Sequence, residues 1–290
     1  MTCKYRFYCL LFIELLFFPY FYFAAWLSKK GRKKFVRTVR KPVVDTCIYV
    51  SVHEWGGYAL SRRKKIRGVR EFVCGLQGQL ERFRNYKGKY KIDLTVTLSD
   101  PSLYKELDVV KKQVDRILFV PNEGMDFAGY KVFYERIKKQ SNAFVILTNS
   151  SVNAIVEDFL DDYIEYMIQN PDVGLMGISY NTKCYQSLIR NNFTPHLQSF
   201  FLLTTVEVLK EMVKLNRGVF PGAGITHKLL LIRKGELAFS TLIMNLGYSL
   251  TVVQEDGSLL KFDRSSSRSA FPFRDMRRQV ANPNKINVIK

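Results

Sequence analysis

One stretch of this 290-residue chain, residues 115–152, constrains the fold more than any other. It contains an apolar strand pattern over residues 117–120, a polar turn, an amphipathic helix pattern, and a second apolar strand pattern over residues 144–147. The order strand, loop, helix, strand predicts a βαβ unit of a parallel sheet. Ligands of such sheets bind in the crevice beyond the carboxyl ends of the strands.

A polar cluster follows each of those two strands. The first cluster contains Asn122, Gly124 and Asp126, and the second contains Asn149 and Ser151. Asn, Asp, Ser and Gly are poor strand residues, so the chain leaves the sheet at these points with polar groups free to bind a ligand. A turn followed by an N-capped helix explains either cluster alone. Because both clusters fall at one edge of the sheet, we predict a binding site there.

The rest of the chain alternates between strand and helix patterns. Strands are predicted at residues 43–52, 92–98, 173–178, 197–203 and 248–253, and helices at residues 66–85, 157–169, 206–215 and from Gly235-Glu236 to about residue 246. The helix at residues 66–85 is basic, and we expect Arg70, Arg82 and Arg84 on or near its solvated face. This alternation predicts an α/β fold that is parallel at least in its first half.

The N-terminal residues 7–27 are nearly all apolar or aromatic. At 1.5 Å per residue they are long enough to cross a bilayer core of about 30 Å. Glu14 and Pro19 interrupt the run, so a kinked hairpin or an anchor lying in the membrane plane is the alternative. Eight basic residues follow the run and only Lys4 and Arg6 precede it, which predicts a cytoplasmic body attached to a membrane.

Charge and cysteine usage limit the classes of partner. The net charge is +19, and the sequence has no zinc-finger spacing or RNP motif, so nucleic acid ranks low as a partner. The five cysteines are scattered without a CxxC pair, which favours reduced thiols over disulfides or a zinc site. We divide the chain into a hydrophobic anchor with a basic collar (residues 1–41), a folded domain (42–262) and a basic, Ser-rich tail with few apolar anchors (263–290).

Four stretches carry a resemblance to a known family. NEGMDFAGY at residues 122–130, LTNSSV at 147–152, HLQSFFLLT at 196–204 and the segment from Gly235-Glu236 to Tyr248 resemble the nucleotide-sugar half of GT-A glycosyltransferases. Among these, the chain is most similar to the rhamnan-synthesis F type of bacterial polysaccharide glycosyltransferases. The resemblance covers about residues 43–253 and implies a GT-A-like, mainly parallel mixed sheet flanked by helices.

The function implied by the resemblance is an inverting transfer of a hexose or deoxyhexose from a nucleotide-diphosphate donor. The implied acceptor is a lipid-linked or growing cell-surface polysaccharide, and other polysaccharide-assembly enzymes are implied partners. The alternative is a non-catalytic subunit that binds a sugar nucleotide or a glycan and docks a partner enzyme at the membrane. A Rossmann-type cofactor site is a weaker alternative, because no GxGxxG follows the first strand.

The resemblance also suggests roles for particular residues. Glu236 is the candidate base, although the helix dipole alone also favours a Glu at a helix start. The donor site is expected to contain His53, Asn122, Gly124, Asp126, Asn149 and Ser151, with Trp55 available to stack on the nucleotide base. His196 and Gln198 are expected to bind the acceptor or the diphosphate, although a lone His is more often a structural hydrogen-bond partner.

No metal ligand is assigned. Many GT-A enzymes hold a divalent metal with an Asp-x-Asp motif, but the corresponding position here reads Thr148-Asn149-Ser150-Ser151. Because Mg²⁺ and Mn²⁺ prefer anionic oxygens, a standard metal site is in doubt. Two alternatives stay open, namely a ligand from Asp126 or Glu123, or basic residues that neutralise the diphosphate in place of a metal. The basic cluster at residues 62–70 is otherwise interpreted as a solvated or membrane-facing surface.

Overall fold

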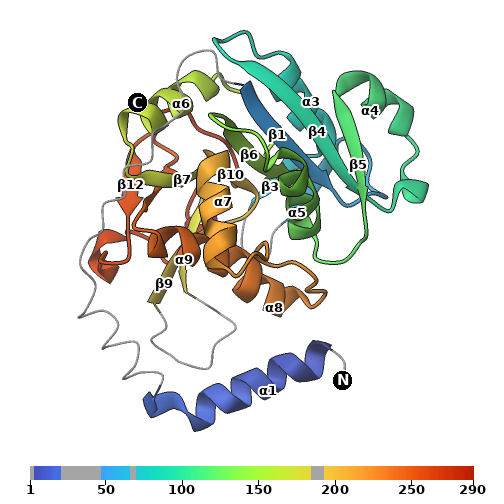
Figure 1. Ribbon diagram of the computed structural model, residues 1–290. Coiled ribbons are helices and arrows are strands. Elements are labelled where there is room, and N and C mark those ends of the chain that lie inside the picture. Colours follow the sequence, from blue (N-terminus) through green and yellow to red (C-terminus); the bar gives the residue numbers. More distant parts are fainter. Residues whose placement is uncertain (1–2, 21–46, 66–69, 184–192) are drawn as a thin grey trace.

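The structure, a computed structural model, describes residues 3–20, 47–65, 70–183 and 193–290 (Figure 1). Its centre is an eight-stranded mixed sheet. In spatial order the strands are β12 (Leu259–Phe262), β11 (Ser249–Val253), β7 (Val173–Gly177), β10 (Phe201–Thr205), β6 (Phe144–Asn149), β1 (Cys47–Glu54), β4 (Lys91–Ser99) and β5 (Arg116–Val120). β6, β1, β4 and β5 are parallel to one another, whereas β10 runs antiparallel to both β6 and β7. The predicted α/β class is therefore confirmed.

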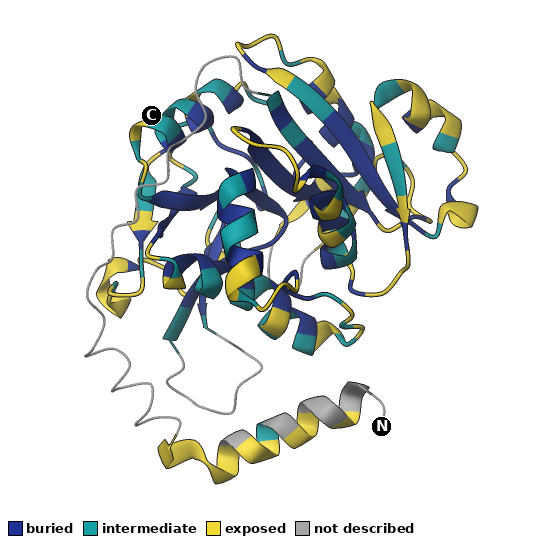
Figure 2. Ribbon diagram, viewed as in Figure 1, coloured by how far each residue is buried: buried dark blue, intermediate teal, exposed yellow. Residues whose placement is uncertain are grey.

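Helices pack on both faces of the sheet. One core joins β1 to residues of α3 (Leu76–Arg84) and α6 (Leu160–Gln169), and the other joins β6 to residues of α5 (Asp126–Ile137), α7 (Val206–Leu215) and α9 (Ala238–Asn245). β6 supplies both cores because its side chains alternate between the two faces. All its residues are buried, in agreement with a central strand covered on both sides (Figure 2).

The βαβ unit predicted from residues 115–152 is present. β5 is followed by α5 and then by β6, with β1 and β4 lying between the two parallel strands in the sheet. Both strands are one or two residues longer than predicted. Arg116 also pairs in β5, and the polar pair Thr148-Asn149 also pairs in β6. Predicted strands near residues 92–98, 173–178 and 248–253 and the helices near 157–169 and 206–215 are likewise present.

The helix predicted at residues 66–85 is wrong in its first half. A hairpin of β2 (Arg62–Lys65) and β3 (Glu71–Cys74) occupies this region, and α3 begins only at Leu76. Phe72, Leu76 and Leu80 fit helical spacing, but Phe72 belongs to the alternating buried pattern of β3. Residues 66–69 lie outside the described ranges. Arg82, expected near solvent, is buried and donates to the carbonyl oxygens of Asn153 and Ile155 at 2.8 Å.

Two further predicted elements differ from the structure. The strand predicted at residues 197–203 is a corner between β9 (Phe193–Leu197) and β10, and β9 pairs with β8 (Tyr180–Lys183). The helix predicted to begin at Gly235-Glu236 begins earlier, with α8 (Lys228–Leu231). It continues through a π-helical turn, Ile232–Leu237, into α9. Glu236 therefore lies inside a helical segment and not at its start.

The C-terminal residues contact the body of the protein more than the sequence suggested. Met276 and Ile286 are buried, and the Tyr163 hydroxyl donates to the Asn287 carbonyl oxygen at 2.6 Å. Short 3₁₀ turns, η3 (Arg268–Ala270) and η4 (Met276–Arg278), interrupt the segment. Residues 263–290 thus have apolar anchors that carry no regular periodicity. The domain boundaries stay predictions.

The N-terminal apolar run is partly described. Residues Cys3–Leu16 form helix α1, drawn apart from the sheet in Figure 1, and several of its apolar side chains are exposed. Within the described residues, no helix is both long enough and apolar enough to span a bilayer. Residues 21–27 of the predicted anchor lie outside the described ranges, so the transmembrane anchor stays a prediction. The basic collar at residues 29–41 lies outside the described ranges.

Gly129 is the point of closest approach between α5 and the sheet. A Cβ atom there would lie 2.3 Å from Thr97 Oγ1 and 2.4 Å from His53 Nδ1, and both side chains are buried. We expect Gly129→Ala to lower the free energy of unfolding by about 1–3 kcal/mol, although Ala is the better helix former. Chemical denaturation checks this, with Lys131→Ala on the exposed face of α5 as the control. Unchanged stability would contradict the tight contact.

Candidate active site

The carboxyl ends of the parallel strands form one polar edge. β1 ends at Glu54, β4 at Ser99 and β6 at Asn149, and the loop after β5 begins the approach to α5. The Asn122 side chain lies in that loop and donates to Asp100 Oδ2 at 2.6 Å. Gly124 has a φ of 94°, so the turn before α5 favours glycine there. The two polar clusters noted in the sequence therefore do lie at a common edge.

Asp126 and Asn149 bring the two clusters into direct contact. The Asn149 amide Nδ2 donates to Asp126 Oδ2 at 2.6 Å, and Asn149 Oδ1 accepts from the Ser151 backbone N–H at 2.8 Å. Burial raises the pKa of Asp126 to about 6, against the lowering effects of the Asn149 hydrogen bond and the Lys64 charge. Near neutral pH the carboxylate is therefore mostly ionised, and its second oxygen can accept a ligand hydroxyl.

Two basic side chains of β2 reach the same edge. Arg62 donates to Ser150 Oγ at 2.8 Å and pairs with Glu54 at 3.2 Å, and the Lys64 ammonium donates to Ser151 Oγ at 2.7 Å. The interpretation of residues 62–70 as a solvated surface is wrong for these two, which are only partly exposed. Arg63 and Lys65, the other two residues of β2, are exposed because side chains alternate between the two faces of a strand.

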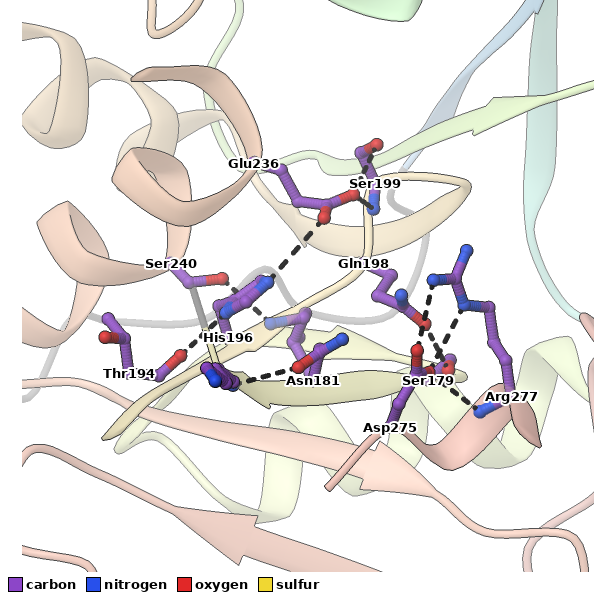
Figure 3. A network of polar contacts seen from close by, with 12 residues as sticks. Ser179, Asn181, Thr194, His196, Gln198, Ser199, Glu236, Ser240, Asp275 and Arg277 are labelled. Atoms are coloured by element: carbon purple, nitrogen blue, oxygen red, sulfur yellow. Dashed lines mark hydrogen bonds and ion pairs between the residues drawn. The ribbon is translucent and has the colours of Figure 1, made fainter. Parts of the chain in front are cut away.

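Glu236 belongs to a second polar network, in which it contacts Ser199 and His196 (Figure 3). Its Oε2 accepts from the backbone N–H of Ser199 at 2.9 Å and from the Ser199 hydroxyl at 3.0 Å. Its Oε1 lies 3.7 Å from His196 Nε2. The other ring nitrogen of His196 lies 2.7 Å from the Thr194 carbonyl oxygen, and because a carbonyl only accepts, Nδ1 carries a proton. A carboxylate oxygen has two lone pairs, so Oε1 keeps acceptor capacity beside His196 that a ligand hydroxyl could use.

Glu236 is held in its ionised form. Burial acts to raise its pKa, but the hydrogen bond and charge of His196, the Ser199 N–H and the charge of Arg277 outweigh burial, and the pKa lies below its ordinary value. The π-helical turn places the residue where an α-helical register would not, a deviation often found at functional sites. An ionised carboxylate with a free lone pair is able to accept a proton.

Tyr130 connects the Glu236 network to Asp126. Its hydroxyl donates to the Ser199 carbonyl oxygen at 2.8 Å, and its ring is fully buried. After burial itself, the charges of Asp126 and Glu236 raise the pKa of Tyr130 further. The structure therefore brings both carboxylates to one side of the sheet edge, within electrostatic reach of each other.

His196 and Gln198, predicted to bind the acceptor or the diphosphate, are both buried. His196 faces Glu236, and Gln198 accepts from the Ser179 hydroxyl at 2.6 Å. In the structure both side chains hold neighbouring polar groups, and their predicted roles at the acceptor or the diphosphate stay predictions. Three residues of the site escaped the sequence reasoning. Ser199 stands inside the quoted HLQSFFLLT motif, and Lys64 was noted only as a member of the basic cluster at residues 62–70. Nothing in the sequence pointed to Arg277.

His53, predicted to bind the donor, lies inside the fold, and its role at the donor site stays a prediction. It is 2% exposed between β1 and α5, and its Nδ1 lies 3.1 Å from Thr97 Oγ1. It is buried because α5 packs closely over it at Gly129. Trp55 and Tyr58, whose rings lie 5.2 Å apart, are exposed beyond the strand and can stack on a base.

Burial of His53 makes folding sensitive to acid. Burial lowers the pKa of His53 to about 4 from 6.5, so the unfolded chain binds the proton more readily. Stability is then lost as the pH falls from about 6.5 to 4, by about 3 kcal/mol in total. Denaturation from pH 7 to 4 checks this, and His53→Gln should flatten the profile. If the stability of His53→Gln falls as steeply with pH as that of the wild type, other groups cause the loss.

The residues present do not match a carboxylate metal site. Across the described ranges, no three or more His, Cys, Asp and Glu side chains are grouped so that they could hold a metal ion. Glu54 is engaged by Arg62, and Asp126 accepts from Asn149. The alternative of a metal ligand from Asp126 or Glu123 therefore lacks supporting groups around it.

No family model matches the chain, and no curated protein matches it. Solved structures that it is similar to include nucleotide-sugar transferases. A mannosyltransferase from Pyrobaculum calidifontis, solved with GDP-Man and Mn²⁺, is 13% identical, with a TM-score of 0.44 and coverage of 87% of this chain and 66% of that one. A glucosyl-3-phosphoglycerate synthase from Mycobacterium tuberculosis, solved with Mn²⁺, UDP-glucose and glycerol 3-phosphate, is 11% identical, with a TM-score of 0.41 and coverages of 69% and 65%. A CMP:2-keto-3-deoxy-manno-octonic acid synthetase solved with CTP is 12% identical, with a TM-score of 0.40 and coverages of 72% and 89%.

Proposed function

We propose that this chain is a glycosyltransferase that uses a nucleotide-diphosphate sugar as donor. One observation carries the proposal. The polar edge of the sheet holds two carboxylates of different character, Asp126 on the Asn149 amide and Glu236 on the Ser199 corner. Environments that shift the pKa values of two carboxyls in opposite directions suit them to different roles.

Each carboxylate has a role in this proposal. Asp126 and Asn149 accept and donate hydrogen bonds to hydroxyls of the donor sugar or ribose, and Trp55 stacks on the base. Glu236 Oε1 accepts the proton of the acceptor hydroxyl as that oxygen bonds to the anomeric carbon. The bond from the anomeric carbon to the phosphate oxygen breaks at the same time, and its electron pair leaves with the diphosphate. Attack opposite the leaving group inverts the anomeric centre.

The biological setting is also a proposal. We infer a lipid-linked or polysaccharide acceptor from the resemblance to the rhamnan-synthesis F type, and attachment to a membrane from the exposed apolar side chains of α1, such as Phe12, Leu15 and Leu16. The net charge of +19 favours an anionic surface. Full-length protein should float with anionic vesicles in a density gradient and float less in high salt. Protein that stays at the bottom with every vesicle composition would refute attachment to lipid.

Equilibrium binding of intact donors tests the proposed function. A nucleotide-sugar that fits should bind more tightly than its parent nucleoside diphosphate, because Asp126 and Asn149 contact the sugar. Asp126→Ala should remove that difference and leave binding of the parent diphosphate. Asp108→Asn, a change on the exposed surface of α4 (Leu107–Gln113), is the control. No binding by any UDP-, GDP- or dTDP-sugar would overturn the proposal.

A further inference from the structure

The hairpin of β2 and β3 places one ammonium group at the polar edge in an unusual setting. Lys64 is partly buried and donates to Ser151 Oγ at 2.7 Å. Ser151 lies in the loop that follows the end of β6. The other cations nearby have carboxylate partners: Arg62 pairs with Glu54 at 3.2 Å, and Arg277 pairs with Asp275 at 3.4 Å. Among the described residues, Lys64 takes part in no such ion pair.

An ammonium group in this setting is prepared for an anion. Burial lowers the pKa of Lys64, and the charges of Arg62 and Arg277 lower it further, against the raising effects of Cys74 and Asp126. Partial burial without a carboxylate partner costs free energy, and a bound anion would offset that cost. Since a Lys ammonium has three donors and Ser151 takes one, two donors are available to a ligand.

The position of Lys64 matches the need of the proposed reaction. Breaking the bond to the anomeric carbon leaves negative charge on the diphosphate, and the group that stabilises it must lie near the sugar site. Ser151, the partner of Lys64, hydrogen-bonds through its backbone N–H to Asn149, which holds Asp126. The resemblance to GT-A enzymes implies a metal-binding Asp-x-Asp motif at the position that here reads Thr148-Asn149-Ser150-Ser151.

We propose that Lys64 binds the diphosphate of the donor and supplies there the positive charge that a carboxylate-bound cation would otherwise supply. This inference rests on the proposed glycosyltransferase function. The leaving diphosphate keeps the electron pair of the broken bond, and Lys64 balances that charge by hydrogen bonding without a proton transfer. Arg62 is a positioning residue that ties β2 to Glu54 and Ser150. Its guanidinium also lies 4.0 Å from the centre of the Tyr58 ring.

The test compares nucleoside diphosphates with the matching nucleosides, both measured on the full chain in EDTA. The wild type should bind one of UDP, GDP and dTDP more tightly than its nucleoside. Lys64→Met should lower the affinity for the diphosphate by about ten- to a hundredfold, as expected for a lost hydrogen bond to a charged group. The affinity for the nucleoside should not change. Lys64→Arg should retain most of the preference. Lys65→Met on the exposed side of β2 is the matched control.

The outcomes separate this inference from the proposed function. The ratio of the two affinities is measured on one preparation, so a loss of folded protein in Lys64→Met does not change it. Two results would overturn the role of Lys64 and leave the function standing. One is a Lys64→Met variant that prefers the diphosphate as strongly as the wild type does, and the other is a wild type that binds diphosphate and nucleoside equally in EDTA. Failure of the wild type to bind any nucleoside or nucleotide overturns both.

Discussion

Replacing Glu236 with Gln is expected to lower the rate of sugar transfer by about 10²- to 10⁴-fold, the usual contribution of a general base. The amide keeps the size of the carboxylate, and its oxygen can still accept the Ser199 hydrogen bonds seen at 2.9 and 3.0 Å. It cannot take a proton from the acceptor hydroxyl. Initial rates at saturating donor and acceptor check this, and donor affinity should not change.

Controls separate a base from a structural carboxylate. Glu135→Gln, on the exposed surface of α5, should transfer sugar at the wild-type rate. If Glu236→Gln loses donor affinity and thermal stability together with turnover, the residue mainly holds the corner between β9 and β10. If Glu236→Gln turns over donor at the wild-type rate, Glu236 is not the base.

Replacing Asp126 with Asn is expected to weaken sugar-nucleotide binding and to stabilise the fold. Burial raises the pKa of Asp126 to about 6, above the 3.8 of an ordinary Asp, so keeping it ionised at neutral pH costs folding free energy. That cost grows as the pH rises from about 3.8 to 6. Because Asp126 is partly exposed, we expect a moderate effect. Asp126→Asn should raise the free energy of unfolding by about 1 kcal/mol at pH 7. Thermal unfolding at pH 7 measures the gain.

The same shift gives donor binding a pH dependence. Binding of the nucleotide-sugar by the wild type should weaken as the pH falls through about 6, where Asp126 gains a proton and loses its role as an acceptor. In Asp126→Asn this inflection should disappear, and the remaining affinity should be independent of pH in that range. A wild-type affinity that does not vary between about pH 5 and 8, or an Asn variant less stable than wild type, would contradict the assignment.

The parts of the fold that the sequence predicted well are those with one dominant periodicity. β6 is apolar throughout because it is covered on both faces, and α7 matches its predicted bounds because its apolar stripe is clear. The corner between β9 and β10 was missed, because residues 197–203 are mainly apolar and have no Gly or Pro at the turn. The β2–β3 hairpin was missed since Phe72 and Leu80 also fit helical spacing.

The candidate site was predictable only in part. Asp126 and Asn149 meet because strand ends in a parallel sheet share an edge, which local patterns reveal. Burial of His53 and His196 could not be predicted, since it depends on how α5 and the π-helical turn pack against the strands. Arg277 reaches the region from a C-terminal segment whose anchors have no periodicity.

The most direct test of the central claim is turnover of a donor panel by the detergent-solubilised wild-type protein. UDP-, GDP- and dTDP-sugars would be incubated with candidate lipid-linked and saccharide acceptors, with Mn²⁺ or with EDTA, and the released nucleoside diphosphate measured. We predict release from one donor class, retained in EDTA and lost in Glu236→Gln. Binding of a donor without any release, by wild type with every acceptor, would contradict an enzyme and favour a non-catalytic subunit that docks a partner at the membrane.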